Sequence, residues 1–388
     1  MPLRIPYTAP FPPPTIHPPS AHSLAGSIAA LASFLSPRPN SSKTLLLTGA
    51  GLSVPSGLPD YRGPRGTYTL RRNYRPVFYA EFVARHASRQ RYFARSYLGW
   101  PAVERVKPNK GYEAVGALGG LGILGGVVTQ NVDALHPRAH PDLPTIELHG
   151  SLHTMTCLSC GTPFPRADFQ TELTRLNPAW AGYMASLPAS IPGNPEDAPA
   201  TTNPDGDAEL QPSANPDGDV APAPGAPAYE TFRYPSCPSC LASPPLLEDG
   251  SRAEIRVDGD GAWMPGSSGG VLKPGVVMFG EGVDPGVRVA AERAVDEAGR
   301  VLVVGSSLAT WSAWRLVRRM RDKGGEVGIV CLGGVRGEGE VVGEGIGGVR
   351  VVGRAEEVLP EVVEALRRRV DGGEGDGGKG SLRAARQL

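Results

Sequence analysis

Four of the five cysteines form two pairs with the spacing of metal ligands: Cys157 with Cys160, and Cys237 with Cys240. Four thiolates complete the tetrahedral shell of a structural Zn²⁺ and leave no position for a catalytic water. The segment between the pairs is far longer than the usual ribbon spacing of about 15–20 residues. A flexible insertion explains this, because loop length costs closure entropy only logarithmically. We therefore predict one structural zinc ion. A redox CxxC would not explain two pairs, and a DNA-binding ribbon would need basic surroundings.

A glycine turn follows an apolar run near the start of the chain. Leu45, Leu46 and Leu47 read as a buried parallel strand. Gly49 and Gly51 then allow the backbone to turn tightly and to approach a ligand without interference from a Cβ atom. Such turns bring backbone N–H groups to a phosphate. The dinucleotide fingerprint G-x-G-x-x-G is not complete, since Pro55 takes the third glycine position. A tight turn without a ligand is the alternative.

Two further strand ends carry polar groups that could do chemistry. Gln130, Asn131 and Asp133 follow the apolar run 126–129, and His149 follows residues 146–148. An imidazole with a pKa near 6.5 can accept a proton at physiological pH. The plainer alternatives are turn chemistry for the Gln-Asn pair and zinc ligation for His149. The four cysteines already complete a zinc shell, which disfavours zinc ligation by His149 and favours a role in acid–base chemistry.

The elements that must position these residues alternate between strands and helices. Apolar runs predict strands at 45–47, 126–131, 301–307, 327–332 and 349–352, and helices over 21–35, 77–100, 286–298 and 355–368. This order is typical of an α/β fold with a Rossmann-like, doubly wound parallel sheet, whose ligands bind beyond the carboxyl ends of the strands. A small zinc-binding module is expected as an insertion.

Composition sets the expected boundaries. Residues 1–20 read as a disordered leader or targeting segment, 21–370 as the catalytic domain and 371–388 as a disordered tail. The zinc module covers about 151–270 and contains low-complexity insertions at 181–229 and 241–270, which lack enough apolar residues to order themselves. No run reaches the roughly 18 apolar residues of a membrane helix.

Charge argues against some partners and suggests a location. Lys+Arg and Asp+Glu both number 39, so no basic excess favours nucleic-acid binding. No acidic residue precedes Asp60, which is compatible with a mitochondrial transit peptide. We expect a monomer in the mitochondrial matrix, with the nucleus or cytoplasm as the alternative.

The succession of motifs resembles the sirtuin family of NAD-dependent protein-lysine deacylases. The motifs are TGAGLSVPSGLPDYRG, TQNVDALH, ELHGSLHTMTCLSC, CPSC, LKPGVVMFGE and VVGSSL, spread over most of residues 40–365. SGLPDYRG, RQRYFARSYLGWP, LNPAW and GSSLATWSAWR look most like the class II branch, which includes mitochondrial sirtuin four. The resemblance implies that NAD is the co-substrate and that an acylated lysine is bound within an extended peptide. The implied products are free lysine, nicotinamide and O-acyl-ADP-ribose.

The resemblance also implies roles for individual residues. His149, Asn131 and Asp133 are expected to be catalytic. The expected NAD contacts are Gly49, Ala50, Gly51, Ser53, Asp60, Tyr61, Arg62, Gln130, Asn131, Asp133, Gly305, Ser306, Ser307, Cys331 and Ala355. The segment that pairs with substrate backbone is expected to be Val277, Met278, Phe279, Gly280 and Glu281. The metal ligands remain Cys157, Cys160, Cys237 and Cys240.

Two positions depart from the family pattern. Cys331 stands in GIVCLGG where the family has an asparagine near the adenosine ribose, and Tyr112 stands where many relatives have histidine. From its apolar surroundings Cys331 reads as a small buried strand residue. The alternative activities are protein mono-ADP-ribosyl transfer and a catalytically silent NAD- or zinc-binding regulatory role.

Overall fold

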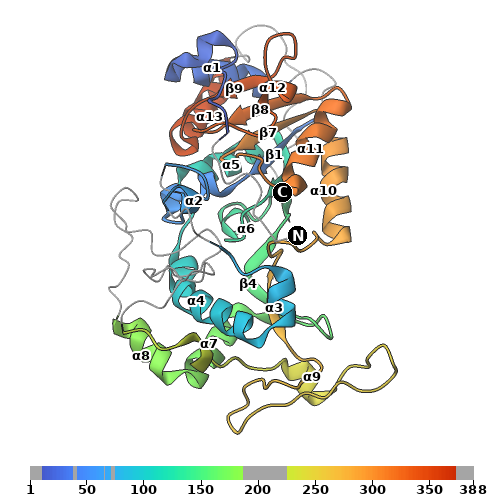
Figure 1. Cartoon of the computed structure of the whole chain (residues 1–388). Coiled ribbons are helices and arrows are strands. Elements are labelled where there is room, and N and C mark those ends of the chain that lie inside the picture. The colour runs from blue at the N-terminus through green and yellow to red at the C-terminus, as the bar shows by residue number, and fades with distance from the viewer. Residues whose placement is uncertain (1–10, 38–41, 65, 71–74, 187–224, 373–388) are drawn as a thin grey trace.

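A six-stranded parallel sheet forms the centre of the larger lobe (Figure 1). The computed structural model describes residues 11–37, 42–64, 66–70, 75–186 and 225–372. The strand order is β3-β2-β1-β7-β8-β9. The order reverses direction between β1 and β7, which is the crevice where open α/β sheets bind ligands. The strands are β1 (Thr44–Thr48), β2 (Leu124–Thr129), β3 (Thr145–Glu147), β7 (Arg300–Val304), β8 (Glu326–Val330) and β9 (Val349–Val351).

Alternating residues of the central strands bury against helices on both faces of this sheet. Leu46 and Leu302 belong to one buried cluster, whereas Leu45 and Val301 belong to another. The first cluster packs against α1 (Leu24–Leu35), α5 (Lys110–Gly120) and α13 (Ala355–Gly372). The second packs against α10 (Pro285–Glu297) and α11 (Trp311–Asp322). Burial on both faces explains why these strands read as continuous apolar runs, and the predicted Rossmann-like sheet is confirmed.

The smaller lobe is built around a three-stranded antiparallel sheet in the order β5-β4-β6. Its strands are β4 (Gly150–Cys157), β5 (Pro163–Pro165) and β6 (Leu272–Val276). Helices α3 (Tyr79–Ala84), α4 (His86–Arg105), α7 (Arg166–Leu176), α8 (Pro178–Ser186) and α9 (Pro238–Ala242) complete this lobe. The expected single helix over 77–100 is two helices, since Arg85 has the extended conformation (φ −124°, ψ 123°). Short helices α2 (Thr67–Leu70), α6 (Leu135–Ala139) and α12 (Glu338–Val341) connect the larger elements.

Residues 241–270 are ordered, contrary to the low-complexity prediction. The Trp263 side chain is 7 % exposed, stacks on Tyr234 at 5.7 Å and lies under the Arg89 guanidinium at 4.6 Å. Isolated bridges join Val257 to Trp263 and Leu246 to Arg252. One buried tryptophan and these bridges hold a segment whose average composition predicts a loop.

The other expected insertion, 181–229, is described only at its ends, and residues 187–224 lie outside the described part of the chain. Residues 181–186 continue helix α8, and Tyr229 stacks on Trp180 at 5.9 Å. The ends of this segment therefore belong to the folded lobe because they complete its aromatic core. The expected tail begins beyond α13, since that helix extends to Gly372.

Residues 11–20, expected as part of a disordered leader, pack against the larger lobe. His17 forms an antiparallel bridge with Arg350, and a short 3₁₀ helix spans Pro19–His22. Backbone hydrogen bonds to the edge strand β9 explain how this proline-rich segment is held. Within the described residues, none of the helices is long and apolar enough to cross a bilayer.

Candidate functional site

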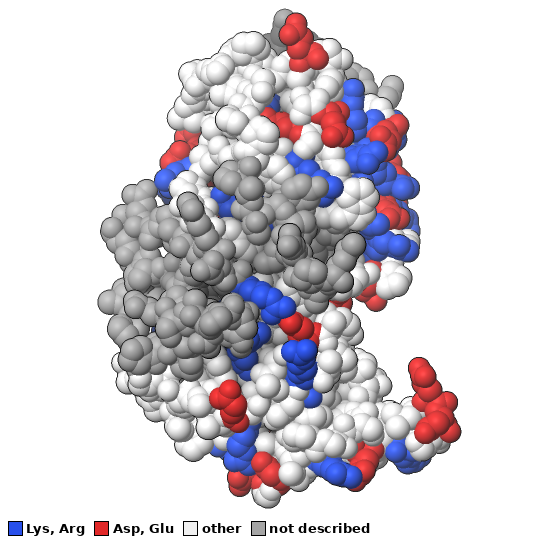
Figure 2. Space-filling model, viewed as in Figure 1, with Lys and Arg blue, Asp and Glu red and all other residues white. Residues whose placement is uncertain are grey.

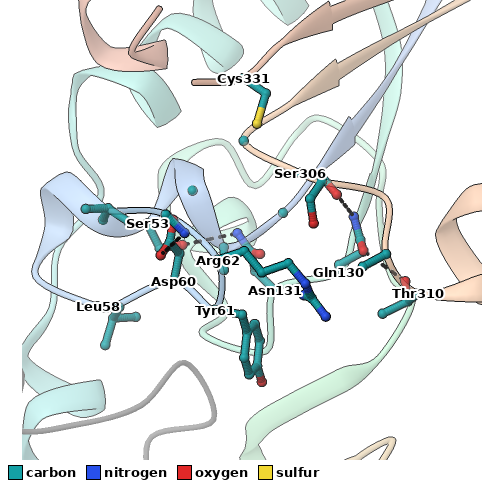
Figure 3. Close-up of a pocket in the computed structure, with 18 of the residues that line it drawn as sticks. Ser53, Leu58, Asp60, Tyr61, Arg62, Gln130, Asn131, Ser306, Thr310 and Cys331 are labelled. Atoms are coloured by element: carbon teal, nitrogen blue, oxygen red, sulfur yellow. Dashed lines mark hydrogen bonds between the residues drawn. The ribbon is translucent and has the colours of Figure 1, made fainter. Parts of the chain in front are cut away.

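A cleft of about 1590 Å³ lies beyond the carboxyl ends of the parallel strands and between the two lobes. It is the crevice that the strand order predicts. Figure 3 shows residues from the β1 turn, from the segment after β2 and from the segment after β7 converging on it. Every residue expected to contact NAD or peptide lines this cleft.

The glycine turn after β1 meets the turn after β7. A Cβ atom on Gly49 would lie 2.7 Å from Ser306 Cβ, and one on Gly51 would lie 2.8 Å from the Gly305 carbonyl oxygen. Gly51 N–H donates to Gly305 O at 2.9 Å, and Gly305 itself has φ +63°. These glycines are therefore required by the approach of two backbone segments. The same approach places their backbone at the switch point, where Ala50 and Ser307 also line the cleft.

His149 lies at the floor of the cleft, just after β3. Its Nδ1 is 3.1 Å from the Gln130 carbonyl oxygen, and its Nε2 is 2.8 Å from Ser312 Oγ. A carbonyl oxygen only accepts, so Nδ1 carries the proton and Nε2 keeps its lone pair. Burial lowers the pKa of His149 to about 4, although its side chain keeps partial access to the cleft. The imidazole is thus neutral at physiological pH, with an Nε2 that can accept a proton.

A buried network lies behind the glycine turn. Ser53 Oγ donates to Asp133 Oδ2 at 2.6 Å, and Asn131 Nδ2 donates to Ser53 Oγ at 3.1 Å. Tyr112 OH is 2.8 Å from Ser53 Oγ, so the tyrosine that departs from the family pattern completes this network. Burial raises the pKa of Asp133, whose Oδ1 also accepts from Leu135 N–H at 3.0 Å. Asp133 and Ser53 therefore fix the loop positions, and the buried Asn131 Oδ1 has no hydrogen-bond partner among the described residues.

Gln130 joins the segment after β2 to the segment after β7 (Figure 3). Its Nε2 donates to Ser306 Oγ at 2.7 Å, and its Oε1 accepts from Thr310 Oγ1 at 3.1 Å. Its backbone carbonyl oxygen also contacts His149 Nδ1, so Gln130 connects His149 to the switch point. Sequence reasoning did not identify Thr310 or Ser312. Both residues lie within the motif GSSLATWSAWR, which is the signal that could have found them.

One loop, which carries Asp60, Tyr61 and Arg62, is stabilised by contacts among its own residues and with Tyr68. Asp60 Oδ1 accepts from Gly63 N–H at 3.0 Å, and burial raises the pKa of this carboxyl group. Tyr61 stacks on Tyr68 at 5.4 Å, with the Arg62 guanidinium 5.1 Å from the Tyr68 ring. The Tyr61 ring also meets Phe279 edge-on at 6.2 Å, so this loop contacts the segment expected to bind peptide.

The segment 277–281 continues from β6 but is not itself a strand. Val277 N–H donates to His149 O at 2.8 Å, which places the segment beside His149. Lys273, 7 % exposed, donates from Nζ to Val276 O at 2.6 Å and to Glu281 Oε2 at 3.0 Å. Glu281 Oε2 also accepts from Met278 N–H at 2.8 Å. Sequence reasoning missed Lys273, whose buried ammonium group binds Val276 O, just before this segment, and Glu281 Oε2, at its end.

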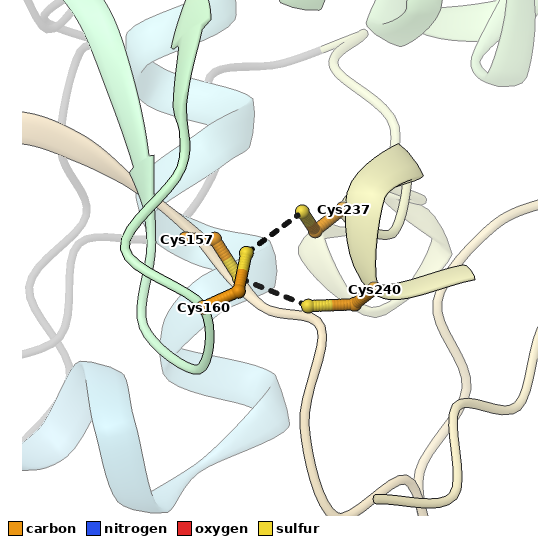
Figure 4. Close-up of side chains that lie close together, drawn as sticks. All are labelled: Cys157, Cys160, Cys237 and Cys240. Carbon is orange, nitrogen blue, oxygen red and sulfur yellow. Dashed lines mark hydrogen bonds between the residues drawn. The ribbon is translucent and has the colours of Figure 1, made fainter. Parts of the chain in front are cut away.

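The four predicted metal ligands come together in the smaller lobe (Figure 4). Their Sγ atoms all lie within 4.8 Å of one another, with Cys157 and Cys240 3.5 Å apart and Cys160 and Cys237 3.7 Å apart. Tetrahedral zinc with Zn–S bonds of about 2.3 Å places sulfur atoms about 3.8 Å apart. The donor set therefore fits a structural zinc joining the β4–β5 turn to α9. His149 and His153 are not among these ligands.

Cys331 and Ala355 lie at the other end of the cleft from His149. Cys331 follows β8 instead of lying within it, so the strand prediction for this residue is wrong by one position. Its side chain is partly exposed and lines the cleft (Figure 3). Ala355 begins α13. His149 and Cys331 therefore mark opposite ends of the site, after β3 and β8.

One family model and several relatives match most of the chain. Residues 49–312 match the Sir2 family. The chain is 38 % identical over 300 residues to the NAD-dependent protein deacylase SIR4 of Batrachochytrium dendrobatidis, covering 76 % of this chain and 83 % of that protein. It is 36 % identical to NAD-dependent protein deacetylase 3 of Pseudomonas syringae, and this match covers 83 % of this chain and 91 % of that protein. It is 33 % identical to the mitochondrial NAD-dependent protein lipoamidase sirtuin-4 of Bos taurus, over 77 % and 76 %.

Solved structures of this family share the fold. A Sir2 homologue bound to ADP-ribose superposes with a TM-score of 0.52 at 24 % identity, covering 89 % of this chain and 97 % of that one. A Sir2 variant bound to a deacetylated peptide and 3′-O-acetyl-ADP-ribose superposes with a TM-score of 0.53 at 22 % identity, over 87 % and 98 %. These matches show that the chain shares the fold of these proteins.

Proposed function

The chain belongs to the Sir2 family, and we propose that it works as an NAD-dependent protein-lysine deacylase. The reaction consumes NAD and water, frees the lysine, and yields nicotinamide and O-acyl-ADP-ribose. The observation that carries this proposal is the state of His149. Its Nδ1–H is held by a backbone carbonyl, and its unprotonated Nε2 lies in the same cleft as the glycine turn.

Residues at different positions along the cleft bind different parts of NAD. The turn segments around Gly49 and Gly305 hold the diphosphate at the switch point. Gln130 and Asn131 orient the nicotinamide ribose, with the unpartnered Asn131 Oδ1 available to a ligand donor. His149 Nε2 takes the proton of a ribose hydroxyl once that hydroxyl replaces Ser312 Oγ, since a neutral base needs no prior deprotonation.

The acylated substrate lies along the segment 277–281 as an extended peptide. Main-chain pairing of this kind tolerates many side-chain sequences, so it favours a class of protein substrates over a single sequence. The segment is fixed by Lys273 and lies against His149 O through Val277 N–H. The acyl-lysine therefore enters the cleft beside the base.

The location of the four cysteines, away from the cleft, fits a structural role for zinc. The four cysteines belong to the smaller lobe, where Cys157, Cys237 and Cys240 are part of its aromatic core. None of the four lines the cleft. Zinc thus stabilises the lobe that carries β6 and the segment after it, and it supplies no Lewis acid to the reaction.

The mitochondrial matrix is the compartment we propose, on the basis of the acid-free N-terminal sequence and the mitochondrial relative. Residues 1–40 fused to a fluorescent protein should then reach mitochondria, and the imported protein should keep residues 11–35, because these residues pack against the larger lobe. A cytosolic fusion would leave the nucleus or cytoplasm as the alternative.

The deacylase activity is tested with a panel of acyl-lysine peptides that carry acetyl, lipoyl and long-chain groups. Mass spectrometry with and without NAD should show loss of at least one acyl group only when NAD is present. NAD-independent loss, or no loss across the panel with NAD, would contradict the proposal. The panel also identifies the preferred acyl group.

A further inference from the structure

We propose that the N-terminal segment 11–15, here called the N-terminal strap, forms the outer wall of the adenosine end of the NAD site. This inference rests on the proposed function, because that function identifies the occupant of the cleft as NAD. Phe11, Pro13 and Pro14 line the cleft together with Cys331 and Gly334. The match to the Sir2 family begins only at residue 49, so the strap lies outside it.

The position of His149 identifies which end of the cleft takes adenosine. His149 follows β3 at one edge of the sheet, and it acts on the nicotinamide ribose. Cys331 follows β8 and Ala355 follows β9 at the opposite edge. A dinucleotide that spans the β1/β7 switch point with its nicotinamide at His149 must place its adenosine towards β8 and β9.

The strap is anchored to this same edge of the sheet. His17 N–H donates to Arg350 O at 3.1 Å, and Arg350 N–H donates to His17 O at 2.6 Å, so His17 forms one antiparallel pair beside β9 at the edge of the sheet. Thr15 N–H donates to Glu338 Oε1 at 2.9 Å. Glu338 Oε2 lies 3.1 Å from Nε of the fully buried Arg350. Helix α1 follows directly and packs in the core, so residues 11–15 extend from a fixed base.

The strap lies directly on the loop after β8. A Cβ atom on Gly334 would collide with the carbonyl oxygen of Pro12 and meet Phe11 Cβ at 3.0 Å. Arg354 and Glu356 flank Ala355 at this end, whereas the side chains of the strap and of the loop after β8 form an apolar wall: Phe11, Pro13, Pro14 and Leu332, of which Leu332 is 48 % exposed. An apolar wall suits a purine ring, whose faces stack on aromatic and aliphatic side chains. We therefore assign to the strap a contact with adenine.

Gly334 offers a way to displace the strap without cutting the chain. Its φ lies outside the left-handed region, so alanine is compatible with the backbone and the collision with Pro12 is the specific effect. G334A should weaken the binding of ADP-ribose and of AMP by roughly threefold to tenfold, the effect of losing one aromatic wall contact. Binding of nicotinamide mononucleotide should not change, since it has no adenosine. The matched control is G339A in α12, where a Cβ meets no atom within 4 Å, and this variant should bind as the parent does.

A second variant separates displacement of the strap from direct blocking by the new methyl group. Deleting residues 1–14 should weaken ADP-ribose binding as much as G334A does, and G334A should then add nothing to the deletion. Calorimetry measures each affinity, and the melting temperature checks that the variants fold. Unchanged affinity in the deletion variant, or an equal effect of G334A with and without residues 1–14, would overturn the proposal. If the parent chain bound no ADP-ribose, the proposed function would fail as well.

Discussion

At the scale of single residues, the site depends on how one carbonyl oxygen orients one imidazole. Gln130 O holds Nδ1–H of His149, and Nε2 remains to accept a proton. H149A should therefore lower deacylation by roughly 10²–10⁴-fold, the usual contribution of a positioned base. Nicotinamide–NAD exchange should survive, because cleavage of the nicotinamide bond precedes the step that needs the base. Zinc content should be unchanged. Full deacylation by this variant would remove His149 from the mechanism.

Glu147, two residues before His149, makes the stability of the folded protein depend on pH. Burial, followed by the charge of Asp133, raises the pKa of Glu147 to about 7 from the ordinary value of 4.5. The folded state therefore binds a proton that the unfolded state releases, and stability falls as pH rises from 4.5 to 7. E147Q removes this loss and should raise the free energy of unfolding by about 1–2 kcal/mol above pH 7.

Thermal melting at pH 8 and at pH 4.5 measures the effect of E147Q. The difference from the parent should be large at pH 8 and absent at pH 4.5, where both forms of residue 147 are neutral in the folded protein. An equal difference at the two pH values would show that the substitution acts through packing instead of charge.

Residue types and strand ends predicted much of the site, but not the direction of each side chain. His149, Gln130 and Asn131 could be placed at the cleft because they follow apolar strands. Ser53 lines the cleft, but its residue type did not reveal that it is 2 % exposed and that its hydroxyl donates to Asp133. Ser312 came from a different segment of the chain, and only the fold brings it to His149. Contacts between residues far apart in the chain, such as that of Ser312 with His149, could therefore not be predicted from the sequence.

At the scale of elements, the segment after β6 is held by a single buried cation. Lys273 Nζ donates to Pro274 O, Val276 O and Glu281 Oε2. K273M leaves these acceptors without a donor and should raise the KM for peptide roughly tenfold, with little change in ADP-ribose affinity. K273R keeps the charge and should retain most of the peptide affinity. A lower melting temperature with an unchanged peptide KM would limit Lys273 to a structural role.

The zinc cluster joins two elements that no strand pairing connects: the β4–β5 turn and α9. C237S removes one of four thiolates, so the ion should be lost, the smaller lobe should unfold and solubility should fall. Metal analysis and thermal melting measure both effects. C331S is the matched control, because Cys331 lies in the other lobe, and its zinc content should stay at one per chain. One zinc retained by C237S at an unchanged melting temperature would contradict the assignment.

Apolar runs predicted the parallel strands well because those strands are buried on both faces. Composition failed for 241–270, where a few residues decide the outcome: Trp263 reaches the aromatic core of the smaller lobe, and Ala253 and Ala262 are also buried. Composition also failed to predict the order of residues 11–20, which are held by backbone hydrogen bonds to β9 and not by a large set of apolar side chains. Average composition does not report single anchoring residues or main-chain pairing.

At the scale of the whole molecule, two lobes enclose one cleft, and the surface charges are balanced. Figure 2 shows Lys and Arg interspersed with Asp and Glu over the region of α10 and α11. Many of these charges are paired, such as Arg319 with Asp296 at 2.6 Å and Arg293 with Glu297 at 2.7 Å. Among the described residues of α10 and α11, the two signs of charge are therefore mixed instead of forming the continuous basic surface that nucleic-acid binding requires.

The central claim is that the acyl group of a lysine is transferred to the ADP-ribose part of NAD. The most direct measurement follows NAD labelled in its adenosine part during a reaction with an acylated peptide. The label should appear in O-acyl-ADP-ribose, in a one-to-one ratio with freed lysine and with released nicotinamide. Label bound covalently to protein would instead identify an ADP-ribosyltransferase. Label found only in unmodified ADP-ribose or in NAD, with the peptide still acylated, would contradict the deacylase mechanism.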